Sequence, residues 1–294
     1  MLDSATETAR PNDLQKVSIR TAVGNSRAGL RIRETLAAIS FARVFTQPVR
    51  FAAREIGGEA AVRSYVVRES SVRIHLRHGT ADSEVVRELF VERVYEPPGP
   101  VVRLLAELER PPRILDLGAN IGLFGAFALG RWPGARIVAV EPDPSNLEIH
   151  RLTVAANPAA DWQLKEAAAA NREGQLPFAA GRFGASAVIE GQASGSGPVR
   201  TVPAIDVLPL MADADLIKID IEGSEWALLE DPRFREVQPR ALVLEHHAHL
   251  CPGPDPRSAA REAIAAAGYE TLEAPLPPGA CPGQGMLWAW RPSA

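Results

Sequence analysis

The chain has 294 residues, 46% of them hydrophobic, which is enough to bury a full core. Its formal net charge of −4, without a basic stripe, excludes the electrostatic footprint of nucleic-acid binding. Two cysteines occur, Cys251 and Cys281, and no apolar run reaches the roughly 18 residues of a membrane helix. We therefore expect a cytoplasmic protein with no disulfide framework, no signal peptide and no nucleic-acid or membrane partner.

The N-terminal part of the chain begins with a segment that shows no pattern. Residues 1–28 are polar, and we interpret them as a loose arm. Across residues 29–57, apolar side chains recur at roughly helical spacing, and Pro48 interrupts the run. This spacing predicts one or two helices that break at Pro48.

The next segment has the period of β-structure. Apolar and polar residues alternate over residues 61–68 and again over 71–77, which predicts a β-hairpin. Helical spacing returns after Asp82, which we interpret as the N-cap of a helix. Residues 29–110 are therefore expected to form an N-terminal helix and hairpin region.

Over residues 111–294, short apolar runs alternate with helical segments. Five runs have the composition of buried parallel strands, namely residues 113–117, 136–140, 162–167, 214–219 and 241–244. The stretch Ser145-Asn-Leu-Glu148 has the pattern of a capping box that opens a helix to about Ala156. This alternation predicts one α/β domain, with a mostly parallel sheet and helices on both faces.

Two later segments depart from that alternation. Residues 171–203 are rich in Gly and Ser, and we expect them to form a loop and hairpin excursion. Tyr269–Glu273 and Met286–Trp290 are predicted to pair as an antiparallel edge of the sheet.

Acidic residues stand at or near the ends of the five predicted strands, at Asp116, Glu141, Glu166, Asp220 and Glu245. In an open α/β sheet, ligands bind outside the carboxyl ends of the strands. Five acids on one rim therefore predict a ligand site there.

The turn Asp116–Gly122 has the spacing G-x-x-x-G, in which glycine permits a sharp bend and a close approach of helix to strand. A dinucleotide-binding turn has G-x-G-x-x-G instead. Asp116 would repel a pyrophosphate, whereas it suits a cationic ligand such as S-adenosylmethionine, which carries an ammonium and a sulfonium. The alternative interpretation is an ordinary tight loop between strand and helix.

Glu141 ends the second predicted strand, and a carboxylate there offers two acceptor oxygens to a ribose diol. It follows Gly118 by 23 residues, a spacing that NAD sites share, so this feature alone does not separate the two cofactors. A solvated acid at a strand end is the alternative.

A lysine inside an apolar strand marks the fourth run. Strand alternation places Lys218, Asp220 and Glu222 on one side, next to the expected cleft. A buried ammonium needs a partner, so a structural ion pair with Asp220 or Glu222 is one interpretation. In the other, Asp220 borders the cofactor while Lys218 or Glu222 orients or polarises the acceptor.

Three histidines follow the fifth run in the stretch Glu245-His246-His247-Ala248-His249. Histidine is the side chain best suited to take a proton near neutral pH, so we interpret His247 as a catalytic base. Binding of zinc or iron by histidine and carboxylate is one alternative, and packing of a loop is another. His246 and His247 point to opposite faces if the strand continues, which opposes the metal.

These stretches together resemble the FkbM family of S-adenosylmethionine-dependent methyltransferases. The resemblance rests on the glycine turn, Glu141–Pro144, Ile217–Glu225, Glu245-x-His247, and Gly79–Asp82 followed by Val85 and Tyr95. It covers about residues 73–250. The stretch Lys218–Gly223 is the most family-specific part, because methyltransferases at large share the glycine turn.

The resemblance implies a class I methyltransferase fold, which is Rossmann-like, and usually O-methylation of a hydroxyl on a sugar or natural product. It implies that S-adenosylmethionine is held by five residues of the turn and second strand, Asp116, Gly118, Asn120, Gly122 and Glu141. It also places Glu166 and Ala167 near the adenine. The expected product is S-adenosylhomocysteine, and the expected partner is a small-molecule acceptor.

For the reaction we expect direct displacement, in which the acceptor hydroxyl attacks the methyl carbon in line with the departing sulfur. Alignment and desolvation then supply most of the acceleration, and a base adds about 10²–10⁴-fold. His247 is the first candidate for that base, followed by Asp220 and Glu222. A nicotinamide-dependent oxidoreductase and a non-catalytic nucleoside-binding module are the rival functions. Residues 1–70 match no family motif and would serve as a substrate-selecting cap or an oligomer contact, for example in a homodimer.

Overall fold

The computed structural model describes residues 42–58, 60–179, 187–188, 199–276 and 282–292. The predicted arm and the predicted helical run up to residue 41 lie outside these ranges. None of the described helices combines the length and apolar character that a membrane span requires.

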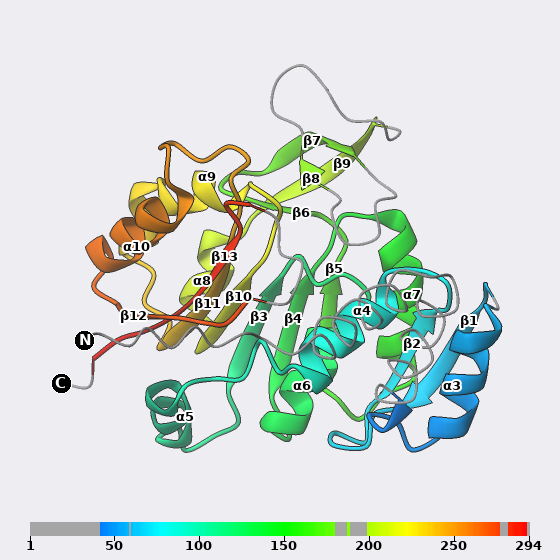
Figure 1. The fold of residues 1–294 in the computed structure, drawn as a ribbon. Helices are drawn as coiled ribbons and strands as arrows, with labels where there is room; N and C mark the ends of the chain where they lie inside the picture. The colour runs from blue at the N-terminus through cyan, green and yellow to red at the C-terminus, as the bar shows by residue number, and fades with distance from the viewer. Residues whose placement is uncertain (1–41, 59, 180–186, 189–198, 277–281, 293–294) are drawn as a thin grey trace, which may run out of the picture.

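A seven-stranded sheet lies at the centre of the molecule, in the strand order β12-β13-β11-β10-β3-β4-β5 (Figure 1). Its parallel strands are β3 (Arg113–Leu117), β4 (Arg136–Val140), β5 (Trp162–Lys165), β10 (Leu216–Ile219) and β11 (Ala241–His246). The antiparallel edge consists of β12 (Glu270–Glu273) and β13 (Gly285–Trp290), and β13 pairs with β11. The predicted α/β fold, its five parallel strands and its antiparallel edge are therefore confirmed.

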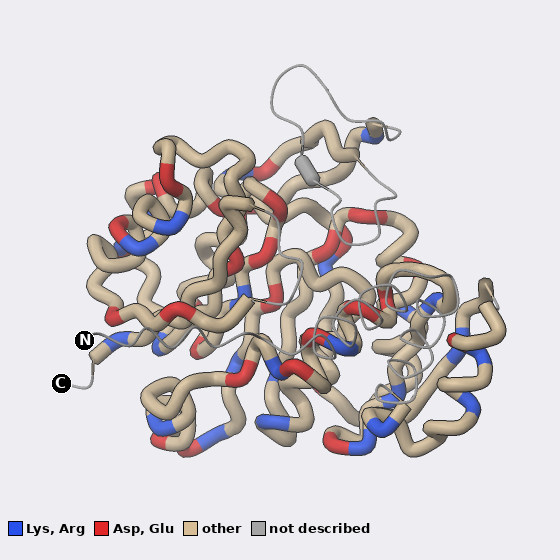
Figure 2. Tube along the Cα trace, in the orientation of Figure 1, with Lys and Arg blue, Asp and Glu red and all other residues tan. Residues whose placement is uncertain are grey.

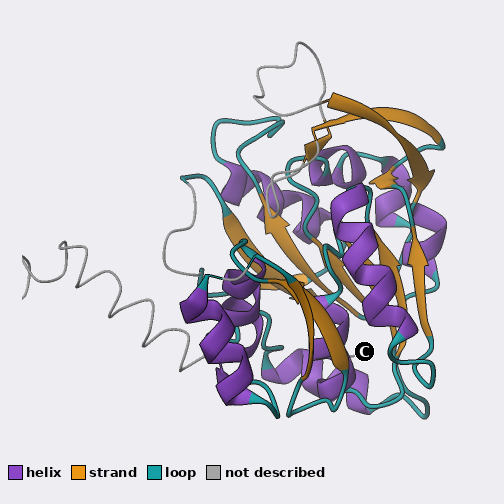
Figure 3. Ribbon diagram, turned by 90° about the vertical axis from the view of Figure 1, so that its right-hand side faces the viewer, coloured by secondary structure: helices purple, strands orange, loops and turns teal. Residues whose placement is uncertain are grey.

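Helices cover both faces of this sheet (Figure 3). One face is covered by α5 (Gly99–Ala106), α6 (Leu123–Arg131) and α7 (Pro144–Ala155), and the other by α8 (Leu208–Ala212), α9 (Glu225–Leu229) and α10 (Pro256–Ala266). Strand alternation separates the two layers, because Leu216 belongs to the first buried cluster and Ile217 to the second.

The chain changes direction across the sheet between β3 and β10. From β3 it proceeds outward through β4 and β5, and it later returns to the other side of β3 to form β10 and β11. Such a reversal of strand order opens a crevice at the carboxyl ends of the two central strands. The glycine turn after β3 and Asp220 after β10 both lie at this point.

The N-terminal hairpin is also confirmed, as β1 (Val62–Val66) paired with β2 (Arg73–Arg77). The hairpin contacts α7, since the backbone N–H of His75 donates to Thr153 Oγ1 at 3.0 Å. Residues Phe45, Phe51 and Tyr65 pack ring against ring in the same buried cluster as α6. The division of the chain into an N-terminal region and an α/β domain stays a prediction.

Proline sets where two helices begin, and for this reason the capping box predicted at Ser145 is wrong. Proline lacks a backbone N–H, so it suits the first turn of a helix, where that group has no partner. Pro48 accordingly begins α3 (Pro48–Gly57), and the predicted break of the helical run at this residue is confirmed. Pro144 likewise begins α7, and the N-cap is Asp143, whose side chain accepts from the backbone N–H of Ser145.

Asp82 is not an N-cap either. It is the first residue of α4 (Asp82–Val86), and Ala81 precedes it as the cap residue. Its carboxylate is buried and accepts from the guanidinium of Arg77 at 2.8 Å, which ties α4 to β2. The π-helix η1 (Arg87–Val91) continues from α4 toward the site.

The predicted excursion forms a small sheet of its own in the order β6-β9-β7-β8. Its strands are β6 (Ala168–Ala170), β7 (Gly174–Ala179), β8 (Ala187–Val188) and β9 (Val199–Asp206). Figure 1 shows this sheet above the carboxyl ends of the central strands. A short 3-10 helix, η2 (Pro232–Arg235), follows α9.

Candidate functional site

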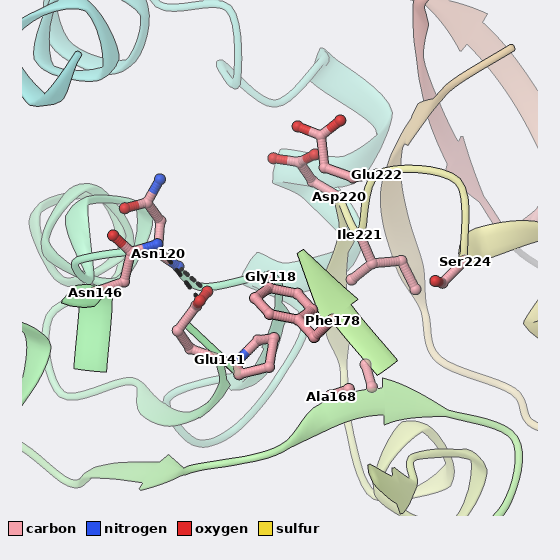
Figure 4. Close-up of a pocket in the computed structure, with 12 residues that line it drawn as sticks. Gly118, Asn120, Glu141, Asn146, Ala168, Phe178, Asp220, Ile221, Glu222 and Ser224 are labelled. Carbon is pink, nitrogen blue, oxygen red and sulfur yellow. Dashed lines mark hydrogen bonds between the residues drawn. The ribbon is translucent and has the colours of Figure 1, made fainter. Parts of the chain in front are cut away.

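Two neighbouring cavities lie at the carboxyl ends of β3, β4, β10 and β11, along an edge with many acidic positions (Figure 2). The first, drawn in Figure 4, is lined among others by Glu141, Ala168, Phe178 and Ile221. The second has a volume of about 240 Å³ and lies beneath α4 and η1. Four residues line both cavities, namely Gly118, Asn120, Asp220 and Glu222. The two cavities therefore adjoin at the switch in strand order.

The glycine turn after β3 is fixed by contacts that no larger residue would allow. Gly118 has φ +75°, and a Cβ there would lie 1.8 Å from the carbonyl oxygen of Asp220. Gly122 has φ +89°, and a Cβ there would lie 2.7 Å from His150 Nε2. Burial lowers the pKa of His150 to about 4, so its neutral ring stays under the turn at 3.1 Å from the carbonyl oxygen of Asn120. These two close contacts, with Asp220 and with His150, explain why glycine is needed at both positions.

Glu141 shapes the floor of the first cavity. Its carboxylate accepts from the backbone N–H groups of Asn120 and Asp143, each at 2.8 Å. Burial nevertheless raises its pKa to about 7. A carboxylate has about four acceptor sites, so Glu141 retains capacity for a ligand hydroxyl in addition to these bonds.

Asp116 does not line either cavity, although the sequence suggested that it faces a ligand. It is fully buried, and the parallel register sets it directly beside Lys218. The Lys218 ammonium lies 3.4 Å from Asp116 Oδ1 and 3.3 Å from Asp220 Oδ2, and it donates to the carbonyl oxygen of Gly118 at 2.8 Å. Burial alone would lower the pKa of Lys218, but these carboxylates raise it above its ordinary value. The predicted ion pair of Lys218 is thus confirmed, and Asp116 acts on the turn through that lysine.

Glu166 lies away from the first cavity. Arg151 binds its carboxylate on the exposed surface, with an Nε to Oε1 distance of 2.6 Å. Ala167, which follows it, is buried, and neither residue lines the cavity. Ala168 and Phe178 of the small sheet take that place. No motif in the Gly- and Ser-rich excursion could have identified Phe178.

The second cavity is strongly acidic. Tyr95 donates to Glu245 Oε2 at 2.8 Å, and the side-chain amide of Gln284 donates to the other oxygen of the same carboxylate. Burial, with Glu245 nearby, raises the pKa of Glu88 to about 7. Burial and the neighbouring Asp220 raise the pKa of Glu222 to about 8. Several carboxyl groups therefore share this wall, and the Lys218 ammonium also lines the cavity.

His247 stands behind these carboxylates and lines neither cavity. Its Nδ1 lies 3.1 Å from Glu225 Oε1, and its Nε2 lies 3.5 Å from Glu222 Oε2. Burial opposes its charge, but the hydrogen bond that its ring donates to Glu225 and the charges of Asp220 and Glu222 raise its pKa to about 10. His247 consequently holds its proton at neutral pH. His246 points to the other side, where it is buried against Trp226.

Asp220, Glu222 and His247 also have the spacing of a three-ligand cation site within the described chain. One ligand atom from each lies within 4.8 Å of the others. A metal ion bound there would have to displace the proton of His247.

In comparison with known proteins, one family model matches a segment of the chain that contains this site. The family model described as "Methyltransferase FkbM domain" matches residues 116–270, more than half of the chain and all of the residues that join the two cavities. The matched segment starts at Asp116 and includes both the glycine turn and the ends of β10 and β11.

Two curated relatives and one crystal structure are similar over parts of their length. "Methyltransferase sdnD" of Sordaria araneosa is 33% identical over 75 residues, 26% of each chain. "AMB antimetabolite synthetase AmbE" of Pseudomonas aeruginosa is 45% identical over 60 residues, 20% of this chain. The matches span 26% of the first relative's length and 2% of the second's. The crystal structure of methyltransferase FkbM from Methylobacillus flagellatus KT aligns with 88% of this chain and 59% of that one, at 15% identity and a TM-score of 0.46.

Proposed function

The chain belongs to the FkbM family of methyltransferases, and from that premise we propose that it transfers a methyl group from S-adenosylmethionine to a hydroxyl of a small molecule. The observation that carries this proposal is the junction of the two cavities at Asp220 and Glu222. One cavity has the chemistry of a nucleoside site, and the other offers a proton acceptor at the shared wall. Methyl donor and acceptor would thus meet between them.

The first cavity fits S-adenosylmethionine by its donor set. Glu141 supplies acceptor oxygens for ribose hydroxyls at the end of β4. Phe178 and Ile221 supply apolar surface for a purine. Asp220, at the border with the second cavity, supplies negative charge for the ammonium or the sulfonium. The carboxylate of Asp220 in this set would repel a pyrophosphate, which supports S-adenosylmethionine over a nicotinamide dinucleotide.

When bound, S-adenosylmethionine supplies a methyl carbon to which the acceptor oxygen bonds as the carbon–sulfur bond breaks, leaving S-adenosylhomocysteine. Glu222 is the residue that we assign to remove the hydroxyl proton. It lines both cavities, and its pKa of about 8 is near the pH at which it must take up a proton. The ammonium of Lys218 lies 3.3 Å from Asp220 Oδ2 and pairs with that carboxylate, so we assign Glu222 and not Asp220 as the acceptor.

His247 has a different role in this assignment than the sequence suggested. It carries a proton already and lines neither cavity, so it serves as a positive neighbour that orients Glu222. The similarity over 60 residues to an antimetabolite synthetase supports a natural product as acceptor. Glu88, Glu222 and Glu245 in the second cavity favour an acceptor without an anionic group at the reacting end.

The test is methyl transfer from radiolabelled S-adenosylmethionine to a panel of sugars and hydroxylated natural products, with matched compounds in which the hydroxyl is replaced by hydrogen. The proposal expects label in the hydroxyl compound and none in its deoxy partner. Label on nitrogen or carbon would contradict O-methylation. Cofactor-dependent oxidation of an acceptor with NAD would contradict the proposal as a whole.

A further inference from the structure

A carboxylate outside both cavities connects the segments that carry the reaction. Glu225, the first residue of α9, is fully buried. Its Oε2 accepts from the backbone N–H of Gly223 at 2.7 Å, and its Oε1 accepts from the backbone N–H of His247 at 2.7 Å. The same Oε1 lies 3.1 Å from His247 Nδ1. One side chain thus ties the turn after β10 to the end of β11.

The turn that Glu225 holds has an unusual backbone. Glu222 has φ +54° and Gly223 has φ +103°, so two consecutive residues lie in the left-handed region. For a residue with a Cβ this conformation is strained and persists only where surrounding contacts fix it. Behind Gly223, a Cβ would lie 2.8 Å from His249 Cδ2, so the loop after β11 packs directly on the turn. The hydrogen bond from Gly223 N–H to Glu225 is one of those contacts.

The same carboxylate sets the direction of the His247 ring. With Nδ1 directed at Glu225, Nε2 faces Glu222 at 3.5 Å and Glu245 at 3.9 Å. Glu225, His247 and Glu222 therefore form a line from the buried core to the shared wall of the cavities. A buried carboxylate that holds one ring nitrogen of a histidine fixes which way the other nitrogen points.

We propose that Glu225 is a positioning residue, which acts through His247 to hold Glu222 in place for proton transfer. The role of Glu222 in this inference rests on the proposed function. The line of contacts from Glu225 through His247 to Glu222 does not depend on that function. Glu225 touches neither cavity, so it is not a catalytic residue.

The charged groups that face this line come from four places. Asp220 lies on the same turn as Glu222, with Lys218 of β10 beside it. Glu245 lies at the end of β11, and Glu88 of η1 faces it across the second cavity. The acids raise the pKa of Glu222, and the charged His247 lowers it. Loss of the His247 charge would therefore move the pKa of Glu222 upward.

The test uses Glu225→Gln, which keeps the shape of the side chain and removes its charge and one acceptor oxygen. Glu230→Gln, on an exposed residue that follows the same helix, is the matched control. Methyl transfer to an acceptor found in the panel is measured against pH. We expect the kcat of Glu225→Gln to fall about 10–100-fold with an unchanged KM for S-adenosylmethionine, and the acid limb of its pH profile to move to higher pH.

His247→Gln is the second variant, and it keeps the proposal open to test if Glu225→Gln does not fold. It should show the same shift of the acid limb, and the double variant should lose little more than either single one. Additive losses, or a lower kcat with an unmoved limb, would overturn the positioning role. Stoichiometric binding of Mn²⁺ at the wild-type site by electron paramagnetic resonance would also overturn it, because His247 would then be a metal ligand.

A readout without any acceptor separates this inference from the proposed function. In protein labelled with ¹⁵N-histidine, the His247 ring should show two protonated nitrogens at pH 8 in the wild type and in Glu230→Gln. It should lose a proton by that pH in Glu225→Gln. If the protein fails to bind S-adenosylhomocysteine but this pattern holds, the proposed function fails and the line of contacts from Glu225 to Glu222 stands. An unprotonated His247 in the wild type would overturn the line itself.

Discussion

The ammonium of Lys218 donates a hydrogen bond to the carbonyl oxygen of Gly118 at 2.8 Å. This contact joins the end of β10 to the turn after β3, at the place where the two cavities meet. The same ammonium balances Asp116 below the turn and Asp220 at its rim. The apolar strand tolerates a lysine because three oxygens surround its charged end, and its bond to Gly118 holds the glycine turn in place.

Lys218→Met should therefore destabilise the protein. Removing one member of a buried ion pair leaves Asp116 charged without a partner, which typically costs about 3–5 kcal/mol. We expect lower thermal stability and at least roughly tenfold weaker binding of S-adenosylhomocysteine, because the glycine turn loses its anchor. Lys165→Met, at the end of β5, is the control. An unchanged melting temperature in Lys218→Met would contradict this account of the turn.

Gly118→Ala tests the close approach of the turn to β10. Its Cβ would lie 1.8 Å from a backbone oxygen of Asp220, and the residue would keep φ +75°. Backbone cannot move aside as a flexible side chain can, so we expect loss of soluble protein or of cofactor binding. Gly253→Ala, where no atom lies within 4 Å of the added Cβ, should behave as the wild type. Normal binding by Gly118→Ala would show that the turn moves freely.

Much of this arrangement follows from patterns in the sequence. Buried strands such as β3 and β4 are continuous apolar runs between turn residues, so their bounds could be predicted to the residue. The glycine turn and Glu141 could be placed at strand ends for the same reason. Lys218 was identifiable because a charge inside an apolar run must have a partner.

Other parts of the site depend on contacts that strand pattern does not encode. Glu166 ends a strand as Glu141 does, yet Arg151 of α7 binds it on the surface. Phe178 reaches the first cavity from a hairpin whose placement over the sheet depends on tertiary packing. In the sequence, Glu225 looks like any acidic residue at the start of a helix. Only the structure shows that it is buried and that it contacts His247.

Glu222→Gln tests the assignment of the proton acceptor. The amide cannot take up the hydroxyl proton, so kcat should fall by about 10²–10⁴-fold. Binding of S-adenosylhomocysteine should stay within a few-fold of the wild type, because Glu141 and the turn remain intact. Asp220→Asn is the comparison, and it should weaken cofactor binding more than Glu222→Gln does. Near-normal turnover by Glu222→Gln would exclude it as the base.

The stability of the ligand-free protein should fall as the pH rises from 6 to 9. Glu141 and Glu222 have pKa values near 7 and 8 in the fold, above their ordinary 4.5, so the stability they contribute is complete below about pH 4.5 and is lost as the pH passes those values. His247 acts in the same direction, since its contribution is complete below its ordinary pKa of 6.5 and is lost as the pH rises toward 10. We expect the melting temperature to drop by about 5 °C across this range.

Glu222→Gln should flatten that dependence, because glutamine does not ionise. A melting temperature that rises between pH 6 and pH 9 would contradict the burial of these carboxyl groups. Differential scanning calorimetry at constant ionic strength measures both curves.

The most direct measurement is calorimetric titration of S-adenosylhomocysteine, and separately of NAD, into the wild type and into Glu141→Gln. We expect the wild type to bind S-adenosylhomocysteine at one site per chain and to show no heat with NAD. Glu141→Gln should bind at least roughly tenfold more weakly, since a charged hydrogen bond to a hydroxyl contributes about 1.5–3 kcal/mol. Binding of NAD, or equal affinity of S-adenosylhomocysteine for both proteins, would contradict the assignment of this cleft to the methyl donor.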